Sequence, residues 1–461
     1  MSLEDTIAAI ATPSGHSGIG IVRMSGKRSF PIAQRIFQPP EGKKVNWSSS
    51  FRIYYGWIVD PDTGNRVDEV LLTLMRAPKT YTREDIVEIN CHGGAVPLRR
   101  TLELTLKLGA RLAEPGEFTK RAFLRGRIDL VQAESVLDVI QARTEKSLEA
   151  ALNALGGKLS QKIFLLKGKM VDLLSYLEAE IDFSSEDLEF LSRRDKEERL
   201  KEILKDVDSL LEATKMGQVY KEGVKAVIVG KPNVGKSSLL NALLQRERAI
   251  VSYVPGTTRD TIEEMVNIKG FPVWIVDTAG LKEAENIVEK EGIIRTHLKM
   301  EEADIVLLLI DGSRPLSKED RVIFEEVKEK QALILINKID LPQRIRKEEI
   351  SSFSRGREIV EISATKEINI DKLKEKLANF VLKEATPSSS DLLIMNLRQK
   401  GALKEARKSV KRALNVLKQG LSEELIAFDL REGINKLGEI TGEVATDEIL
   451  DRIFSRFCIG K

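Results

Sequence analysis

The stretch of residues 227–237, VIVGKPNVGKS, constrains the fold of this chain more than any other feature of the sequence. Three β-branched residues predict a short buried strand, the glycines then open a loop, and a helix is expected to run on from Lys236. Backbone amides in such a loop can surround phosphate oxygens, and the helix N-terminus adds positive potential. The pattern predicts a phosphate-binding loop; a glycine-containing turn between a strand and a helix is the plainer alternative.

Bulk properties set the outer limits on function. A length of 461 residues suggests about two to four domains, each large enough for its own core. Charged residues make up 31% of the chain but balance to a net charge of +2, so any surface that attracts nucleic acid or membrane must be local. Two cysteines form no disulfide framework, and three histidines argue against a zinc site. Without a signal peptide or a long apolar run, we expect a soluble, cytoplasmic protein with no membrane partner.

The first part of the chain, residues 1–118, predicts an α+β domain. Helical spacing covers residues 98–108, and Cys91 and His92 sit side by side in a CHGG segment. That pair could suggest a nucleophile and its base, but catalytic partners usually meet across a fold, so we favour a packed or turn-forming Cys91. Short strands separated by turns are expected at residues 6–10, 18–23, 51–59, 70–74 and 86–89.

Helical periodicity dominates from residue 119 onwards. Leucine, isoleucine and methionine recur at steps of three and four over residues 148–181, which predicts one long helix, and the pattern repeats over residues 200–211. Further helices are expected at residues 392–417 and 421–440, and a last helix is expected to be capped by Thr446.

A helical pattern that is interrupted by an α/β pattern predicts one all-α bundle with a domain inserted into it. The expected parts are a first helical part at 119–222, an inserted α/β nucleotide domain at 223–382 and a second helical part at 383–461. Because the bundle would hold both ends of the inserted domain, a movement of that domain driven by the nucleotide would be transmitted to the bundle.

The sequence contains two groups of basic residues, and it allows two roles for each of them. The helix after the nucleotide domain carries cations from Arg398 to Arg412, with Glu405 as the only acid among them. Each group fits either a solvated helix face or a track for RNA phosphates. The second group consists of Lys120, Arg121, Arg125 and Arg127.

The phosphate end of the nucleotide site is predicted from three loops. Lys236 should reach the β- and γ-phosphates and Ser237 should ligate Mg²⁺. Asp277, which follows a strand at residues 273–276, would hold Mg²⁺ through water, and the Gly280 amide would sense the γ-phosphate. Thr258 is placed to close over Mg²⁺ and the γ-phosphate in the GTP state.

The base is predicted from the strand at residues 333–336, which delivers Asn337-Lys338-Ile339-Asp340 at its carboxyl end, where open α/β sheets place ligands. A carboxylate there can accept hydrogen bonds from two guanine N–H groups at once, a pattern that adenine does not present. Ser363-Ala364-Thr365 after a further strand strengthens the preference for guanine. The expected GTP contacts are Asn233, Val234, Gly235, Lys236, Ser237, Ser238, Asp277, Gly280, Asn337, Lys338, Asp340, Ser363 and Ala364.

The residue after the DTAG string is Leu281, where Ras-type enzymes place a glutamine that orients water. Because leucine cannot hold the attacking water, efficient hydrolysis must use another group. An acidic stretch that includes Glu289 follows, and it is either catalytic or a solvated segment. Arg259 could supply an arginine finger, but an ion-pair partner is the more ordinary role for such a residue.

Several strings taken together point to one family. They are GKPNVGKS, AIVSYVPGTTRD, DTAGL, NKID and SAT in the inserted domain, TPSG, GIGIVR and AEPGEFTKRAFLRGR before it, and a terminal FCIGK. Over its whole length the chain resembles the bacterial tRNA-modification GTPases of the MnmE or TrmE family. The GTPase strings belong to a superfamily; the N-terminal strings and the FCIGK terminus narrow the resemblance to this family.

The resemblance implies a homodimer joined through N-terminal domains that bind a reduced folate, 5-formyl- or 5,10-methylene-tetrahydrofolate. It also implies a partner enzyme dependent on FAD, in a heterotetramer or larger complex, that together with this protein modifies C5 of the wobble uridine in certain tRNAs. The family's folate contacts fall on Arg23, Glu88 and Arg127. The family has a lysine at the position of Arg127. Arginine preserves the positive charge there, but its head group is larger and planar.

The resemblance also implies how GTP is hydrolysed without the glutamine that orients water in Ras-type enzymes: a K⁺ ion stimulates the reaction. Asn233 matches its side-chain ligand, while Ser252, Val254 and Thr257 match positions that supply backbone carbonyls. A monovalent cation near the phosphates can supply the charge that an arginine finger supplies elsewhere. The family's catalytic positions fall on Thr258, on Glu289 for the attacking water, and on Cys458 for the modification.

The predicted function is therefore that of a K⁺-stimulated GTP hydrolase that acts in modification of the tRNA wobble uridine with a folate one-carbon unit. The alternative is a regulatory GTPase switch that binds ribosomal or other RNA without one-carbon chemistry.

Overall fold

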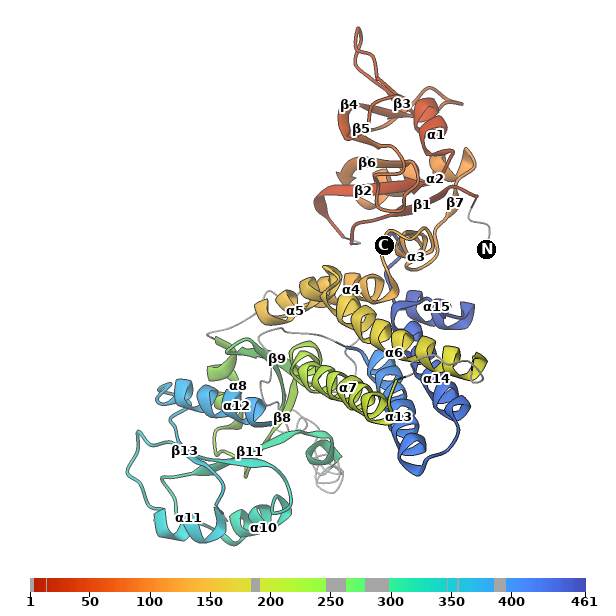
Figure 1. Ribbon diagram of the computed structural model, residues 1–461. Coiled ribbons are helices and arrows are strands. Elements are labelled where there is room, and N and C mark those ends of the chain that lie inside the picture. The colour runs from red at the N-terminus through yellow and green to blue at the C-terminus, as the bar shows by residue number, and fades with distance from the viewer. Residues whose placement is uncertain are drawn as a thin grey trace. The chain divides into compact units, whose positions relative to one another are not determined.

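The computed structural model describes residues 4–13, 15–183, 191–245, 263–277, 298–345, 347–354, 356–384 and 395–461. The chain divides into two compact units (Figure 1). The first unit comprises Met1–Leu137, Leu155–Glu178 and Ala427–Lys461, and the second comprises Asp138–Ala154 and Ala179–Ile426. The domain boundaries predicted at residues 118, 222 and 382 stay predictions.

The first unit contains a seven-stranded sheet in the order β3-β4-β5-β6-β2-β1-β7. Neighbouring strands pair antiparallel, except that β1 and β7 are parallel. The five predicted strands are confirmed, whereas the two-residue strands β3 and β7 are too short to leave a periodic signal. The strands are β1 (Ile7–Ile10), β2 (Ser17–Ser25), β3 (Phe37–Gln38), β4 (Arg52–Val59), β5 (Arg66–Met75), β6 (Ile86–Gly93) and β7 (Arg111–Leu112).

Helices α1 (Ser29–Ile36) and α2 (Ala95–Lys107) pack on this sheet through their apolar sides. Along β5, Leu72 and Leu74 are buried and Leu71 is exposed, so alternate residues face the core and the solvent. These two helices cover one face of the sheet, and Phe118 packs with Ile7 and Ala9 on the other face of β1. This is the α+β arrangement that the strand pattern predicts.

The remainder of the first unit is mostly helical. Thr446 caps α15 as predicted, because its hydroxyl accepts a hydrogen bond from the Ile449 amide. Phe454 and Phe457 pack with Leu130 in a small core at the end of the chain. Besides α1 and α2, the helices that lie wholly or mainly in this unit are α3 (Glu117–Leu124), α4 (Leu130–Gln141), α6 (Lys158–Asp182), α14 (Glu423–Thr441) and α15 (Asp447–Phe454).

The prediction of one long helix over residues 148–181 is wrong. The chain forms α5 (Glu145–Leu155) and α6, separated by Gly156 and Gly157. Gly157 has φ +85°, a left-handed conformation that ends helices and that glycine adopts without steric cost. Apolar spacing in the sequence hid the break, because leucines recur at steps of three and four across the glycines. In the structure, α5 buries Ala150, Ala151 and Ala154 and exposes Leu148 and Leu152.

The second unit contains a six-stranded sheet in the order β13-β12-β11-β8-β10-β9, parallel except for the edge strand β9. Continuous apolar runs such as residues 305–310 form its central strands, as expected of a parallel sheet buried on both faces. The strands are β8 (Val224–Val229), β9 (Glu263–Ile268), β10 (Phe271–Asp277), β11 (Ile305–Asp311), β12 (Ala332–Asn337) and β13 (Ile359–Glu361).

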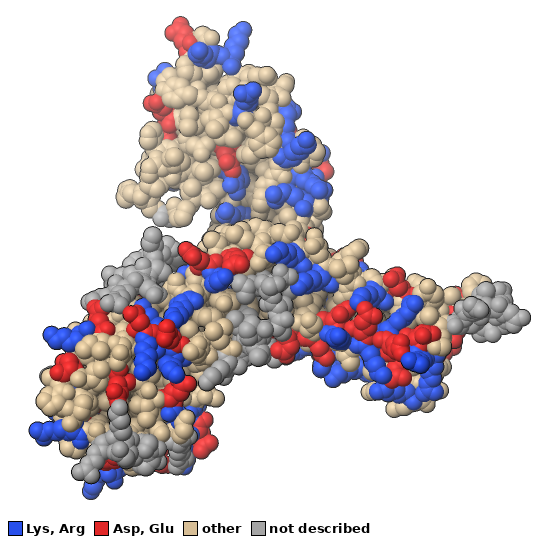
Figure 2. Space-filling view, turned by 60° about the vertical axis from the view of Figure 1, so that its left-hand side comes forward, with Lys and Arg blue, Asp and Glu red and all other residues tan. Residues whose placement is uncertain are grey.

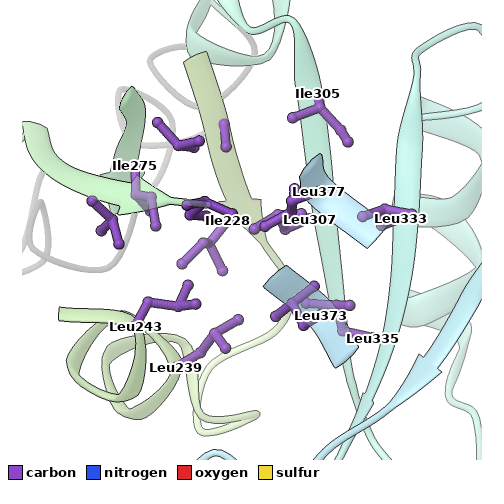
Figure 3. Packing of buried hydrophobic residues seen from close by; sticks show 14 of the residues in the cluster. Ile228, Leu239, Leu243, Ile275, Ile305, Leu307, Leu333, Leu335, Leu373 and Leu377 are labelled. Carbon is purple, nitrogen blue, oxygen red and sulfur yellow. The ribbon is translucent and has the colours of Figure 1, made fainter. Parts of the chain in front are cut away.

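Helices cover both faces of this sheet. Figure 3 shows Leu239 and Leu243 of α8 (Lys236–Gln245) and Leu373 and Leu377 of α12 (Ile370–Glu384) beside the sheet residue Ile228 in one apolar cluster. A second cluster, which lies under α10 (Lys318–Glu326) and α11 (Lys347–Ser354), buries the opposite face. This rigid α/β core positions the loops at the carboxyl ends of β8, β11 and β12.

Two long helices of the second unit flank this α/β core in the sequence, and they pack against each other: α7 (Arg193–Glu222) and α13 (Leu397–Gln419). Arg407 forms an ion pair with Asp208, and Lys400 Nζ donates to Gln218 Oε1 at 2.9 Å. The segments that enter and leave the nucleotide region are therefore held side by side within this unit (Figure 1).

Charged side chains of both signs are interspersed over the face seen in Figure 2. This mixture accords with the near-zero net charge of the chain. Within the described ranges, no helix combines the length and the apolar character that crossing a bilayer requires.

Candidate functional site

The predicted phosphate loop joins a buried strand to a helix, since β8 ends at Val229 and α8 begins at Lys236. Asn233 and Gly235 have φ values of +64° and +103°, which turn the loop sharply. A Cβ added at Gly235 would lie 2.3 Å from Asn337 Nδ2, and one at Gly230 would lie 2.4 Å from the Leu309 carbonyl. Glycine is therefore required at both positions, and the loop can present backbone amides at the start of α8.

Asn337, at the end of β12, connects three loops of the site. Its Nδ2 donates to the Val234 carbonyl at 2.7 Å, and its Oδ1 accepts from the Ala364 amide at 2.9 Å. The Asn337 side chain is buried, so both bonds are shielded from water. The phosphate loop, the end of β12 and the loop after β13 are thereby held in one arrangement.

Two lysines hold the carbonyls of the phosphate loop. Lys236 Nζ donates to the carbonyls of Gly230 and Lys231 at 2.8 and 2.7 Å. Lys338 Nζ donates to the Asn233 carbonyl at 2.9 Å and to Asp311 at 2.7 Å. Burial alone would raise the pKa of the Asp311 carboxyl, but hydrogen bonds from Lys338 and Ser313 hold the pKa below its usual value.

The predicted base-side residues lie at the same end of the sheet. Asp340 is exposed three positions after Asn337, and Ser363 is buried at the start of the loop that carries Ala364. Backbone hydrogen bonds in both directions between Ser363 and Ile368 close that loop. Ser237 and Ser238 lie in the first turn of α8, and Ser237 is exposed. The role of Ser237 as a Mg²⁺ ligand stays a prediction.

Part of the predicted catalytic set lies outside the described residues. Asp277 ends β10 opposite Ile228 of β8, and only its backbone is described. The other predicted positions outside the described residues are Ser252, Val254, Thr257, Thr258, Arg259, Gly280, Leu281 and Glu289.

The first unit contains a cavity of about 540 Å³ that brings together the three residues predicted from the resemblance to contact folate, Arg23, Glu88 and Arg127. It opens between the sheet and the start of α4. We call it the ring cavity. Its other lining residues are Met75, Tyr81, Ile86, Ile128, Gln132, Val136, Leu155 and Lys461.

Arg23 and Glu88 are cross-strand neighbours on β2 and β6, with Arg23 Nε 2.7 Å from Glu88 Oε1. The Arg127 guanidinium lies over the Tyr81 ring, 4.7 Å from its centroid. The Tyr81 hydroxyl lies 2.8 Å from the Thr119 hydroxyl, and burial raises the pKa of Tyr81. The cavity thus pairs apolar walls with a carboxylate and two guanidinium groups, a combination suited to a flat heterocycle with polar edges.

The terminal FCIGK segment lies at this cavity. Arg23 Nη1 donates to the Gly460 carbonyl at 3.1 Å, and Ile459 forms a β-bridge with Pro115. A Cβ at Gly460 would lie 2.6 Å from the Ile10 carbonyl, so the segment passes close to β1. Cys458 is exposed just before this anchored stretch.

Arg121, a member of the second basic group, belongs neither to a solvated face nor to an RNA track. Arg121 is 1% exposed and forms ion pairs with Asp5, Glu84 and Glu117. Arg125 pairs with the same Glu84. Both alternatives are therefore wrong for Arg121, because only burial among three carboxylates explains its position.

The other members of the basic groups are mixed. Lys120 pairs with Asp451, and on α13 Arg407 pairs with Asp208 and Lys408 with Glu405. The paired cations on α13 favour an ordinary charged helix face over a continuous phosphate track.

Cys91 is a packed residue. Its thiol is buried 3.6 Å from the Thr101 hydroxyl, and burial raises its pKa to about 12. His92 points instead to Asp68, with Nδ1 2.7 Å from Oδ1. The thiolate is therefore disfavoured at neutral pH, and the two residues do not form a nucleophile and base.

Two family models match the chain. The model described as MnmE helical domain matches residues 130–458, and the model described as GTP-binding protein TrmE N-terminus matches residues 6–127. A protein of Thermoanaerobacter pseudethanolicus named tRNA modification GTPase MnmE is 47% identical over 457 residues, 99% of both chains. A protein of Desulforamulus reducens with the same name is 46% identical over 460 residues, 100% of both chains. A solved structure of Aquifex aeolicus Era bound to GDP and AlF4⁻ covers 40% of this chain and 66% of its own, at 28% identity and a TM-score of 0.27.

Proposed function

This chain belongs to the MnmE family of tRNA modification GTPases, and from that premise we propose that it hydrolyses GTP and acts on tRNA with an FAD-dependent partner. The proposed reaction modifies C5 of the wobble uridine with a one-carbon unit that a reduced folate supplies. Its place of action is the cytoplasm, where tRNA is modified.

The observation that carries this proposal is the ring cavity. Arg23, Glu88 and Arg127 come from β2, β6 and the turn after α3, yet they line one space of about 540 Å³. Glu88 Oε1 accepts from Arg23, whereas Oε2 has no hydrogen-bond donor among the described residues. A carboxylate oxygen in this position can accept from the N–H groups of a pterin ring. A GTPase switch that only bound RNA would not need such a cavity.

The GTP cycle uses the loops at the carboxyl end of the second sheet. The amides of the loop around Gly235 and the Lys236 ammonium would surround the phosphates, and the Asp340 carboxylate would select guanine. Mg²⁺ would be held by Ser237 and Thr258. Glu289 would act on the attacking water, and Cys458 would take part in the modification reaction.

The proposed K⁺ site uses the Asn233 side chain together with backbone carbonyls of Ser252, Val254 and Thr257. Asn233 supports this role because its side chain is exposed on a left-handed turn while its own carbonyl is held by Lys338. A monovalent cation bound there would supply charge beside the phosphates, where Leu281 cannot orient water.

A homodimer joined through the N-terminal domains accords with an exposed apolar row on the first sheet. Phe51, Ile53 and Tyr55 are 62%, 65% and 46% exposed, and Leu71, paired with Tyr55 across the strands, is 43% exposed. Exposed apolar groups gathered on one sheet face are typical of an interface. Sedimentation should show that Ile53→Arg converts a dimer into a monomer, whereas Leu397→Arg, at a 73% exposed position of α13, leaves the dimer intact.

Calorimetry tests the folate part of the proposal. The wild-type chain should bind 5-formyl-tetrahydrofolate, and Arg23→Ala should weaken binding at least about 10-fold because it removes a charged donor and frees Glu88. Lys44→Gln, at an exposed site outside the cavity, serves as the control. If the wild-type chain binds no reduced folate, the alternative of an RNA-binding switch is preferred.

A further inference from the structure

A second cavity, of about 420 Å³, adjoins the ring cavity and shares Met75, Tyr81 and Arg127 with it. We call it the side cavity. A ligand seated in the ring cavity therefore lies close to the residues that line the side cavity. The residues that line only the side cavity are Phe51, Pro78, Lys79, Thr80 and Arg83.

The side cavity is basic. Its described lining contains the cations Lys79, Arg83 and Arg127 but no carboxylate. The nearest acid in the sequence, Glu84, is buried and paired with Arg121 and Arg125. Its charge is therefore already balanced, and the positive potential of the side cavity is left for a ligand.

The three cations are available to bind a ligand. Neither Lys79 nor Arg83 nor Arg127 forms an ion pair with any part of the chain that the structure describes. Arg83 Nη1 donates to the Arg125 carbonyl at 2.8 Å, which holds the guanidinium in place without neutralising it. The Arg127 guanidinium lies over the Tyr81 ring, and no described group accepts a hydrogen bond from its N–H groups, which are therefore available to an anion.

We propose that the side cavity binds the γ-linked glutamate tail of a polyglutamylated reduced folate whose ring occupies the ring cavity. This inference rests on the proposed function. Each added glutamate brings one carboxylate, and the lining of the side cavity offers the three cations Lys79, Arg83 and Arg127. The affinity for the folate would then rise with the number of glutamates in its tail. Arg127, which lines both cavities, would contact both the ring and the tail.

An RNA phosphate would also suit these cations, but the geometry favours the folate tail. The side cavity adjoins the ring cavity, with which it shares three lining residues, so an anionic chain attached to the ring reaches these cations without a separate binding event. An RNA strand would instead have to bind there independently of the ring.

Calorimetry on the full chain with 5-formyl-tetrahydrofolate carrying one or five glutamates tests this inference. The pentaglutamate should bind about 5- to 30-fold tighter, because two or three additional exposed ion pairs form, and the gain should shrink in 0.5 M salt. Lys79→Gln should reduce the gain by about 1.5- to 5-fold, because one of these ion pairs is lost, while the monoglutamate affinity stays the same. Lys79→Arg should restore the gain, and Lys44→Gln, an exposed charge-matched control in the same unit, should keep it.

The outcomes separate this inference from the function on which it rests. If neither folate binds, the proposed function fails. If both bind with equal affinity, or if the gain is undiminished in Lys79→Gln, the side cavity does not bind the tail. If Lys79→Gln weakens tRNA binding and leaves the glutamate gain unchanged, the cations serve RNA and the inference is overturned.

Discussion

Arg23 and Gly460 are 437 positions apart in the chain, yet the Arg23 guanidinium donates to the Gly460 carbonyl at 3.1 Å. The same guanidinium pairs with Glu88 in the ring cavity. Lys461, the next residue, lines that cavity, and its carbonyl accepts from the Phe118 amide at 3.2 Å. The end of the chain is therefore part of the proposed folate site, and it sets the position of Cys458.

Cys458→Ser should abolish tRNA modification while leaving GTP hydrolysis and folding intact. Its thiol is exposed, so the exchange of sulfur for oxygen disturbs no packing. Nucleoside analysis of the product tRNA, phosphate release and a thermal scan measure the three properties. Full modification by the serine variant would remove Cys458 from the proposed chemistry.

Alkylation with iodoacetamide should distinguish the two thiols of the folded chain. Burial raises the pKa of Cys91 to about 12, so its thiolate stays scarce up to pH 9, and its side chain is also shielded from the reagent. Peptide mass mapping at pH 8 should find the label on Cys458 and leave Cys91 free until the protein is unfolded. Rapid labelling of Cys91 in the native protein would contradict the packing described here.

Gly235→Ala should weaken GTP binding by about 10- to 100-fold. The added Cβ would meet Asn337 Nδ2 at 2.3 Å, and φ is +103°, so both the loop and its link to β12 must shift. Gly401→Ala is the matched control, because a Cβ there meets nothing within 4 Å inside α13. The control should bind GTP normally and gain about 0.5–1 kcal/mol of stability. A fluorescent GTP analogue measures the affinity, and equal affinities for both variants would contradict the loop geometry.

Asn233→Gly should erase the preference for K⁺ over Na⁺ in GTP turnover. Glycine adopts the left-handed φ of +64° without strain, so the variant removes the side-chain oxygen and preserves the backbone of the loop. Turnover should be compared in KCl and NaCl at the same ionic strength. A ratio that matches that of the wild-type chain would show that no K⁺ ion is bound through Asn233.

The buried Arg121 cluster should make the first unit sensitive to acid. Burial alone would raise the pKa values of Asp5 and Glu117, but hydrogen bonds from Arg111 and Arg121 bring both below their ordinary 3.8 and 4.5. Carboxyls with lowered folded-state pKa values stabilise the fold above those ordinary values, and this contribution is lost as the pH falls through the lowered values.

Thermal unfolding between pH 7 and pH 2.5 tests that cluster. Glu117→Gln should lower the free energy of unfolding by about 3 kcal/mol at pH 7, because Arg121 loses one of its partners. The decrease in stability towards acidic pH, here called the acid limb, should also become less steep. Asp62→Asn, which removes a fully exposed pair with Lys107, should leave the curve almost unchanged. Identical acid limbs for the wild-type chain and Glu117→Gln would show that Glu117 does not contribute.

Local patterns allowed much of the fold to be predicted. The strand, loop and helix around Gly235 follow from residues that are neighbours in the sequence, and so does the cap at Thr446. The break at Gly157 was missed because apolar spacing continues across it, although the paired glycines were a visible signal for a helix end.

Long-range contacts explain what could not be predicted. The sequence places Arg121 among other cations, and only the folded chain brings Asp5 and Glu84 to it. Tyr81 and Gln132 line the ring cavity but belong to no motif, so nothing local marks them. Arg23, Glu88 and Arg127 were predicted from the family resemblance, and their common cavity depends on strand pairing that no single segment specifies.

Mass spectrometry of wobble-uridine nucleosides is the most direct test of the central claim. Deletion of the gene should remove the C5-modified uridines from tRNA, and the wild-type chain should restore them. Arg23→Ala should fail to restore them even though it still hydrolyses GTP, because it removes a contact of the proposed folate site and the bond that anchors the segment carrying Cys458. Unchanged C5-modified uridines after deletion, or full restoration by Arg23→Ala, would contradict the claim that this GTPase modifies tRNA with a folate-borne carbon.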